Sequence, residues 1–205
     1  MLDEQVAKAE HGTGAQIVLA FVKRSDIYAE LPWKAFALGA GLAGLASTLL
    51  DLLKPSWAAT NTVLFATTTI LATGAFLALA CVSIPAFARL FLDGFRADTE
   101  VRQYAESLFL SRQLFSTKNR TGVLLLVSLF ERRAVILPDS GLAGRLPAEA
   151  RDKIAAKLAP QLAAGRLKNA LEQGLAELAN VLGADQAGAS GKNELPNAVV
   201  EGEGA

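Results

Sequence analysis

The polar residues with the clearest chemical potential flank a predicted strand hairpin. Four precede the strand that begins at Gly122 and two follow the strand that ends at Pro138: Lys118, Asn119, Arg120, Thr121, Asp139 and Ser140. An antiparallel hairpin brings the start of one strand beside the end of the other, so we expect these side chains to lie close together. One carboxylate with hydroxyls and cations can bind an anion, or hold a metal ion weakly through oxygen ligands.

A structural interpretation of the same residues is simpler, and we favour it. Arg120 and Asp139 would form an ion pair across two loops, and turn hydrogen bonds would hold the neighbouring residues. The candidate residues for a ligand or anion are Asn119, Arg120, Thr121 and Ser140. Asp139 is the candidate metal ligand, for which calcium or magnesium would be the cofactor.

Other catalytic sets lack the residues they need. A catalytic triad would have to use His11, the only histidine, from a terminal helix. A zinc site would need His11 and Cys81, which belong to different parts of the chain. The lone thiol of Cys81 cannot form an internal disulfide and is expected to face lipid or a neighbouring helix. With 20 basic and 20 acidic residues among 205, no basic surface indicates nucleic acid as a partner.

Three apolar runs are expected to form the strands that position the polar cluster: Ala15–Val22, Gly122–Leu129 and Arg133–Pro138. The second run is apolar on both faces, which is typical of a central strand. We expect it to form a hairpin with the third run and a parallel pair with the first, which makes a short mixed sheet. The turn at Glu131-Arg132-Arg133 is expected to be solvated, with a phospholipid headgroup contact as the alternative.

Helical spacing accompanies these strands in four segments: Leu2–His11, Glu100–Leu114, about Pro147–Leu158 and about Gly165–Leu182. In the last segment, leucines recur along one side and must pack on another element. From Gly183 onward small and acidic residues dominate, so residues 185–205 are expected to form a disordered tail.

Two long apolar stretches interrupt this α/β pattern. They predict spans over about residues 33–53 and 62–88, each long enough for a bilayer core of about 30 Å. The short link between them, broken by Pro55, requires an antiparallel hairpin. Pro85 is expected to kink the second helix near the membrane surface.

Small residues recur every four positions along the first span, at Ala35, Gly39, Ala43 and Ser47. Such a face lets another helix approach closely. The simplest partner is the second span, whose own face toward it would consist of Thr69, Thr73 and Leu77. A second copy of the protein is the alternative partner, so a homodimer is possible.

The distribution of basic residues predicts the orientation of the hairpin. Basic residues flank both outer ends of the spans, whereas the link carries only Lys54: the outer residues are Lys23, Arg24, Lys34, Arg89, Arg96 and Arg102. The positive-inside rule therefore predicts that both termini are cytoplasmic.

Five short segments, taken in order, resemble the TPM domain, a family named for thylakoid-lumen, photosystem II and acetylcholine-receptor-modulator proteins. The segments are Thr13-Gly14-Ala15-Gln16-Ile17-Val18, Arg24-Ser25-Asp26, Asn119-Arg120-Thr121-Gly122-Val123-Leu124, Glu131-Arg132-Arg133-Ala134-Val135 and Asp139-Ser140-Gly141-Leu142. The resemblance covers roughly residues 1–184. It is closest to bacterial membrane proteins in which two spans interrupt the domain.

The resemblance implies a small TPM-like α/β sandwich interrupted by a two-helix transmembrane hairpin. The expected division is residues 1–30 for its first helix and strand, 31–95 for the hairpin, 96–184 for the remainder and 185–205 for the tail. It also implies roles in the assembly, repair or modulation of membrane complexes, and an acid-phosphatase activity in some members. Those members have Asp-Asn-Gly ahead of the central strand, where this chain has Arg120-Thr121-Gly122.

We therefore expect a two-pass protein of the bacterial inner membrane, in contact with the lipid bilayer. Its cytoplasmic domain would bind a membrane protein rather than catalyse a reaction. The alternative is a divergent metal-assisted phosphatase that uses Asp139 together with Asp26.

Overall fold

The chain folds into two compact units that are built from different parts of the sequence. The computed structural model describes residues 2–53, 60–183, 200–202 and 204. Met1–Asp26 and Gly94–Ala205 form one unit, here called the sheet domain, and Ile27–Asp93 form the other, the helix pair. The helix pair is thus an insertion in the sequence of the sheet domain.

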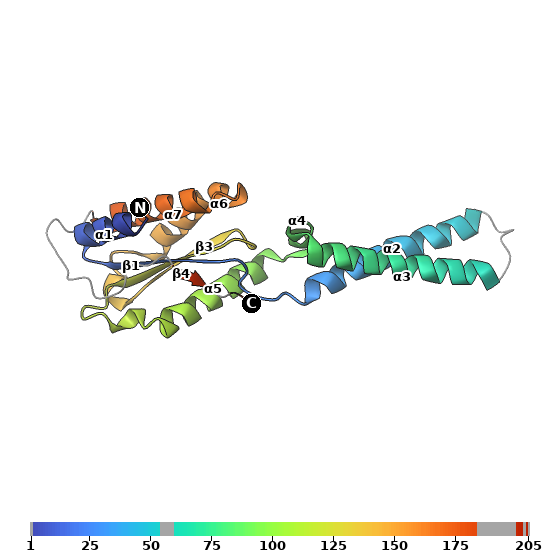
Figure 1. Ribbon diagram of the computed structural model, residues 1–205, viewed down its shortest axis with the longest axis horizontal. Coiled ribbons are helices and arrows are strands. Elements are labelled where there is room, and N and C mark those ends of the chain that lie inside the picture. The colour runs from blue at the N-terminus through green and yellow to red at the C-terminus, as the bar shows by residue number, and fades with distance from the viewer. Residues whose placement is uncertain (1, 54–59, 184–199, 203, 205) are drawn as a thin grey trace. The chain divides into compact units, whose positions relative to one another are not determined.

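A four-stranded mixed sheet organises the sheet domain, with the strand order β3-β2-β1-β4 (Figure 1). β1 (Gln16–Val22) pairs in parallel with β2 (Gly122–Ser128), which forms an antiparallel hairpin with β3 (Arg133–Pro138). Every residue of β2 is buried. The predicted central strand, hairpin and parallel pair are therefore confirmed, and the helix pair lies in the crossover between β1 and β2.

The fourth strand, β4 (Val200–Gly202), was not predicted. It pairs in parallel with β1 at residues 20–22 and so covers the edge of the sheet that lies opposite β3. The predicted disorder of the C-terminal segment is wrong for these three residues. Residues 184–199 lie outside the described part of the chain. The sequence signal for β4 is weak because three residues are too few to show a period.

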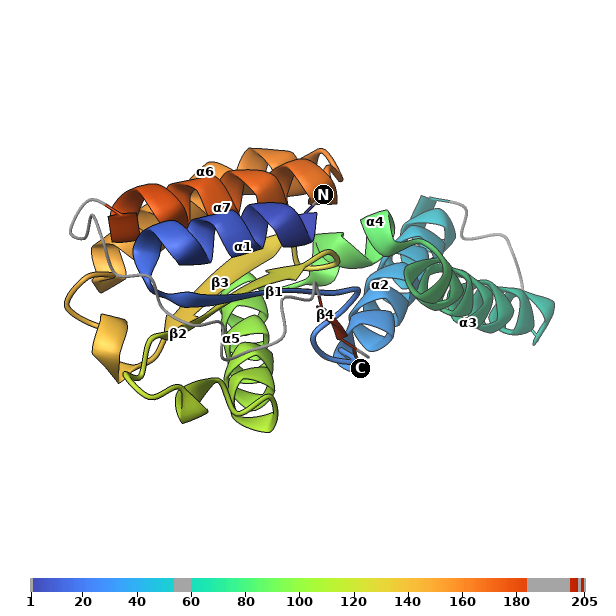
Figure 2. The same ribbon diagram turned by 60° about the vertical axis from the view of Figure 1, so that its left-hand side comes forward.

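Helices cover both faces of the sheet (Figure 2). α1 (Leu2–Thr13), α6 (Ala148–Ala163) and α7 (Leu167–Gly183) pack on one face, where Ile17, Leu19 and Leu125 are almost completely buried. α5 (Gly94–Ser111) and the short helix η2 (Leu114–Ser116) cover the other face around Val18, Leu124 and Leu126. The predicted α/β sandwich is therefore confirmed, and it has three layers.

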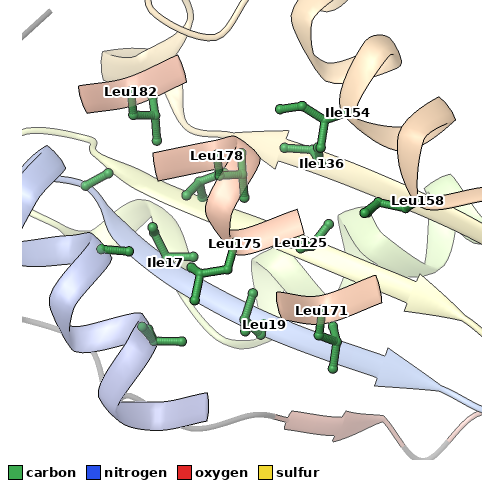
Figure 3. Packing of buried hydrophobic residues seen from close by; sticks show 14 of the residues in the cluster. Ile17, Leu19, Leu125, Ile136, Ile154, Leu158, Leu171, Leu175, Leu178 and Leu182 are labelled. Atoms are coloured by element: carbon green, nitrogen blue, oxygen red, sulfur yellow. The ribbon is translucent and has the colours of Figure 1, made fainter. Parts of the chain in front are cut away.

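The leucine stripe of α7 forms the centre of the larger core (Figure 3). Leu171, Leu175, Leu178 and Leu182 are buried there against the sheet and α6. Burying one leucine side chain contributes about 1.5–3 kcal/mol, so this stripe holds α7 on the sheet.

Arg145 joins the ends of two of these helices. It lies just after the short helix η3 (Ser140–Leu142) and donates to the carbonyl oxygens of Thr13, at 3.0 Å, and Leu182. These carbonyls belong to the last turns of α1 and α7, where a cation is favourable.

The inserted unit consists mainly of two long helices, α2 (Glu30–Leu53) and α3 (Thr60–Ser83), which pack on each other. At 24 residues and 1.5 Å per residue, each is about 36 Å long. The link that carries Lys54, Pro55 and Trp57 lies outside the described residues.

The stretch predicted as one kinked helix over residues 62–88 is broken. α3 ends at Ser83, and Ile84 is extended, with φ −120° and ψ 98°. Pro85 then begins a new short helix, α4 (Pro85–Ala88), which continues into η1 (Arg89–Phe91). Proline suits a first helical turn but excludes αR backbone from the residue before it, so the break falls at Ile84 rather than as a bend.

The surface of the helix pair is apolar. Leucine, valine and phenylalanine side chains point outward along both helices, and only 11% and 6% of their apolar windows are buried. The core helix of a soluble protein would be mostly buried. By length and composition, α2 and α3 can each cross a membrane.

Candidate functional site

The predicted cluster at the hairpin ends is assembled around Asp139. This carboxylate is buried, and its Oδ1 accepts a hydrogen bond of 2.7 Å from the backbone N–H of Ser140. Its Oδ2 is buried without a hydrogen-bond partner, and Arg120 Nη1 lies 3.9 Å away. The arrangement therefore contains the predicted ion pair at long range, together with one carboxylate oxygen that lacks a close donor.

A close backbone contact brings the two loops together. A Cβ on Gly141 would lie 2.3 Å from the carbonyl oxygen of Asn119 and 2.6 Å from that of Arg120. The N–H of Gly141 donates to the Arg120 carbonyl oxygen at 3.0 Å. Arg120 has a φ of 53°, which turns the chain into β2. Glycine is needed at 141 because any side chain would separate the loops.

The remaining candidates surround this contact at different depths. Asn119 and Ser140 are exposed, Arg120 is more than half exposed, and Thr121 is half-buried. The N–H of Thr121 is bonded to Thr117 Oγ1 at 3.0 Å. Because three of the four side chains are exposed and one backbone donor is already used, the described geometry resembles a tied loop crossing more than a closed pocket.

The described residues around Asp139 offer few ligands for a divalent cation. Calcium takes six to eight oxygen ligands, and magnesium takes one or two carboxylates together with several waters. Among the described residues, no group of three or more acidic, histidine or cysteine side chains comes together. The nearest charged group to Asp139 is a guanidinium, which would repel a cation.

Asp26 does not join Asp139. In the sheet register Gly122 lies beside Gln16, and the N–H of Asp139 donates to the Gly122 carbonyl oxygen at 2.8 Å. Asp139 thus lies at the starting end of β1, whereas Asp26 follows its finishing end. Seven strand residues, about 23 Å, separate these ends. Asp26 instead pairs with Arg96 at 3.1 Å, so a two-aspartate site is not formed.

Two comparisons relate this chain to known proteins. The TPM domain family matches residues 86–181. The TPM domain match thus covers 86–181, and most of these residues belong to the sheet domain, which we call the TPM domain. Its fold is also similar to the NMR structure of the BA42 protein from the psychrophilic bacterium Bizionia argentinensis. That likeness has a TM-score of 0.56 at 16% sequence identity and covers 98% of this chain and 90% of that one. No curated protein matches the sequence.

The family match begins after the long helices, at residue 86, so α1 and β1 lie outside it. β1 nevertheless pairs with β2 along all seven of its residues, from Gln16↔Gly122 to Val22↔Ser128. The sheet of the TPM domain is therefore completed by a strand that precedes the helix pair in the sequence.

A buried polar cluster lies at the other end of the TPM domain sheet. Glu131 Oε1 accepts from the N–H of Ser25 at 2.9 Å, and its Oε2 accepts from Ser128 Oγ. Ser25 Oγ lies 3.2 Å from Ser128 Oγ, and all three residues are buried. The prediction of a solvated turn is wrong for Glu131, which ties the segment after β1 to the β2–β3 hairpin. A charged residue in a predicted turn suggested exposure to solvent. The burial of Glu131 is visible only in the folded structure.

The small-residue face of α2 lies in the interior of the helix pair. Ala35 and Gly39 are buried, and Ala43 and Ser47 are partly buried. A Cβ on Gly39 would lie 2.9 Å from the Thr73 carbonyl oxygen and 3.1 Å from the Cα of Gly74. The face is thus occupied by α3. Cys81, also on α3, is buried.

Proposed function

We propose that this protein is a two-pass protein of the bacterial inner membrane whose TPM domain lies in the cytoplasm. The domain binds another membrane protein during assembly, repair or modulation of a complex. The observation that carries the proposal is the apolar helix pair inserted within the crossover of the TPM domain. Both ends of the inserted helix pair are joined to the TPM domain. Two connections, rather than one, therefore hold the domain at the membrane.

The outward side chains of the helix pair support membrane insertion. Along α2 and α3 the exposed large residues are apolar, including Leu42, Leu45, Phe65 and Phe76. In water this surface would be costly at about 25 cal/mol per Å², whereas in lipid it is solvated. The lipid bilayer is therefore the first partner that we propose.

The basic residues at the outer ends of the pair support a cytoplasmic TPM domain. Fusion of a reporter after Ala205 tests this orientation. We expect a cytoplasmic reporter, such as green fluorescent protein, to be active and a periplasmic alkaline phosphatase to be inactive. The reverse result would contradict the orientation, and a second fusion within residues 54–59 should report the opposite side.

A protein partner is favoured over an enzymatic role by the candidate site. Asp139 and Asp26 are far apart, and the surroundings of Asp139 suit an ion pair. Gly39 and its neighbours already contact α3, which leaves this face unavailable to a second copy. Photo-crosslinking in native membranes, followed by purification, tests the proposal. We expect a specific membrane protein in the crosslinked product, and recovery of this chain alone would contradict it.

A further inference from the structure

β3 forms one edge of the TPM domain sheet, and its outer side runs the length of the strand. Among the described residues, no strand pairs with the outer side of β3. In the antiparallel register, the backbone N–H of Asp139 donates to β2. Hydrogen-bonded positions alternate along the strand, so the backbone groups of Val135 and Leu137 also point toward β2. The N–H and C=O groups of Ala134 and Ile136 therefore point outward. Pro138 lacks an N–H and ends this row of open groups.

A groove of about 430 Å³ runs along this edge, between α5 and α6. Its floor is residues 134–137, and on α6 it is bordered by Ala155, Ala156 and Ala159. The alanine side chains are short, so the space beside β3 is free for the side chains of an additional strand. Extended peptides bind such edges by main-chain hydrogen bonds, with alternate side chains on either side.

The groove is positively charged. Four arginines and two aspartates line it: Arg102, Arg132, Arg133, Arg151, Asp98 and Asp152. Arg102 pairs with Glu106 at 3.0 Å, and Arg133 pairs with Asp98 at 2.6 Å. Neither Arg132 nor Arg151 is among the ion pairs of the described residues, and the buried Nε of Arg151 lacks a hydrogen-bond partner. An acidic ligand would complement both.

The opposite edge of the same sheet already accepts a short strand of this kind. β4 lies along β1, and Glu201 of β4 approaches Lys23 to 3.7 Å. A brief extended segment with an acidic side chain thus adds to this sheet within the chain itself. β3 presents the equivalent opportunity to another protein.

We propose that the β3 edge of the TPM domain binds an extended acidic segment of a partner protein by strand addition. This inference rests on the proposed function, since it names the surface and the chemistry by which the domain recognises a partner. Outward backbone groups supply the hydrogen bonds, and Arg132 and Arg151 select acidic side chains.

Fluorescence anisotropy with the full-length protein in detergent micelles tests the proposal. The probe is a fluorescein-labelled peptide of three Glu-Val repeats, compared with one of three Lys-Val repeats. We expect binding of the acidic peptide only, and Ala134→Pro should weaken it at least tenfold because it removes an outward N–H and no bond to β2. Ala134→Val keeps that N–H and should bind as the natural protein does.

Two further comparisons keep the test independent of the folding of the proline variant. A Glu-Val peptide with every backbone amide N-methylated retains its charge but loses its backbone hydrogen-bond donors in either register, and it should bind at least tenfold more weakly. Arg132→Glu combined with Arg151→Glu should abolish binding, whereas Arg166→Glu, exposed and outside the groove, should not. Equal binding of the methylated peptide, or no binding of the acidic peptide, overturns the proposal.

An anion site without strand addition would give a different pattern. Inorganic phosphate or phosphatidylglycerol vesicles would then compete fully with the peptide at equal charge, and Ala134→Pro would have no effect. That result also overturns the inference. The crosslinking experiment separates this inference from the proposed function. If the natural protein and Ala134→Pro capture the same partner equally, strand addition at β3 is contradicted but the proposed function stands. If the peptide binds as expected and no partner is captured, the function fails alone.

Discussion

Glu131 shows how a single charged residue can stabilise a domain from inside. Its two carboxylate oxygens accept from a backbone N–H of one segment and the hydroxyl of another. Neither donor has a water-facing alternative, because Ser25 and Ser128 are also buried. The carboxylate is therefore a structural acceptor whose removal leaves two buried donors unsatisfied.

We predict that Glu131→Ala lowers the free energy of unfolding of the TPM domain by about 1–3 kcal/mol, the cost of stranded buried donors. Urea unfolding followed by circular dichroism measures the change. The matched control is Glu149→Ala on the exposed first turn of α6, which should lose less than about 1 kcal/mol. Equal losses in the two variants would contradict a buried role for Glu131.

Asp139 contrasts with Glu131. The sequence indicated a role in chemistry for Asp139, whereas in the structure its contacts hold two loops together. We predict that Asp139→Ala leaves any hydrolysis of p-nitrophenyl phosphate unchanged in the presence of calcium, magnesium or manganese. The same substitution should lower the free energy of unfolding of the TPM domain by about 1 kcal/mol, because the N–H of Ser140 loses its acceptor. A loss of metal-dependent hydrolysis in this variant would restore the phosphatase interpretation.

At the scale of elements, the crossing of α2 and α3 depends on backbone approach. Gly39 faces Thr73 and Gly74, whereas Gly41, two residues away, has no atom within 4 Å of an added Cβ. The two glycines lie on one helix with the same propensity, so they separate packing from helix formation.

We predict opposite effects for Gly39→Ala and Gly41→Ala. At position 39 the new methyl group overlaps the α3 backbone and should cost about 1–3 kcal/mol. At position 41 it meets open space, and the higher helix propensity of alanine should contribute up to about 1 kcal/mol. Thermal loss of the helical circular dichroism signal in micelles measures both, and equal midpoints would show that the helices do not pack at Gly39.

At the scale of the whole molecule, the TPM domain holds its cores without the helix pair. Both clusters of buried hydrophobic residues consist only of residues from the sheet domain. The two chain ends where the insertion begins and ends are also close, since Arg96 Nη2 lies 3.1 Å from Asp26 Oδ2. The helix pair could therefore be deleted without loss of the hydrophobic cores of the TPM domain.

We predict that replacing residues 27–93 with a short glycine-serine linker yields a soluble, monomeric TPM domain. The apolar surface of α2 and α3 is then absent, while the contacts of β1 with β2 remain. Size-exclusion chromatography and dispersed amide signals in an NMR spectrum would show this. Aggregation, or signals collapsed into the random-coil range, would mean that the helix pair is needed for folding.

Local patterns in the sequence determined much of this protein. Apolar runs of seven or eight residues indicated β1 and β2, the leucine spacing indicated α7, and two uncharged stretches indicated α2 and α3. The ordered motifs also indicated the TPM domain. Each of these features can be recognised in a short stretch of sequence, because helix and strand periods involve neighbouring residues only. The close hairpin loops followed as well, because β2 and β3 are adjacent in the chain.

Only the tertiary structure decided which distant residues meet. It separated Asp26 from Asp139, because parallel β1 and antiparallel β3 place them at opposite ends of the sheet. It buried Glu131, which no local pattern distinguishes from a solvated charge, and it added β4 to β1. Burial and pairing across many residues depend on register and packing, so the roles of these charged groups emerge only when the chain is folded.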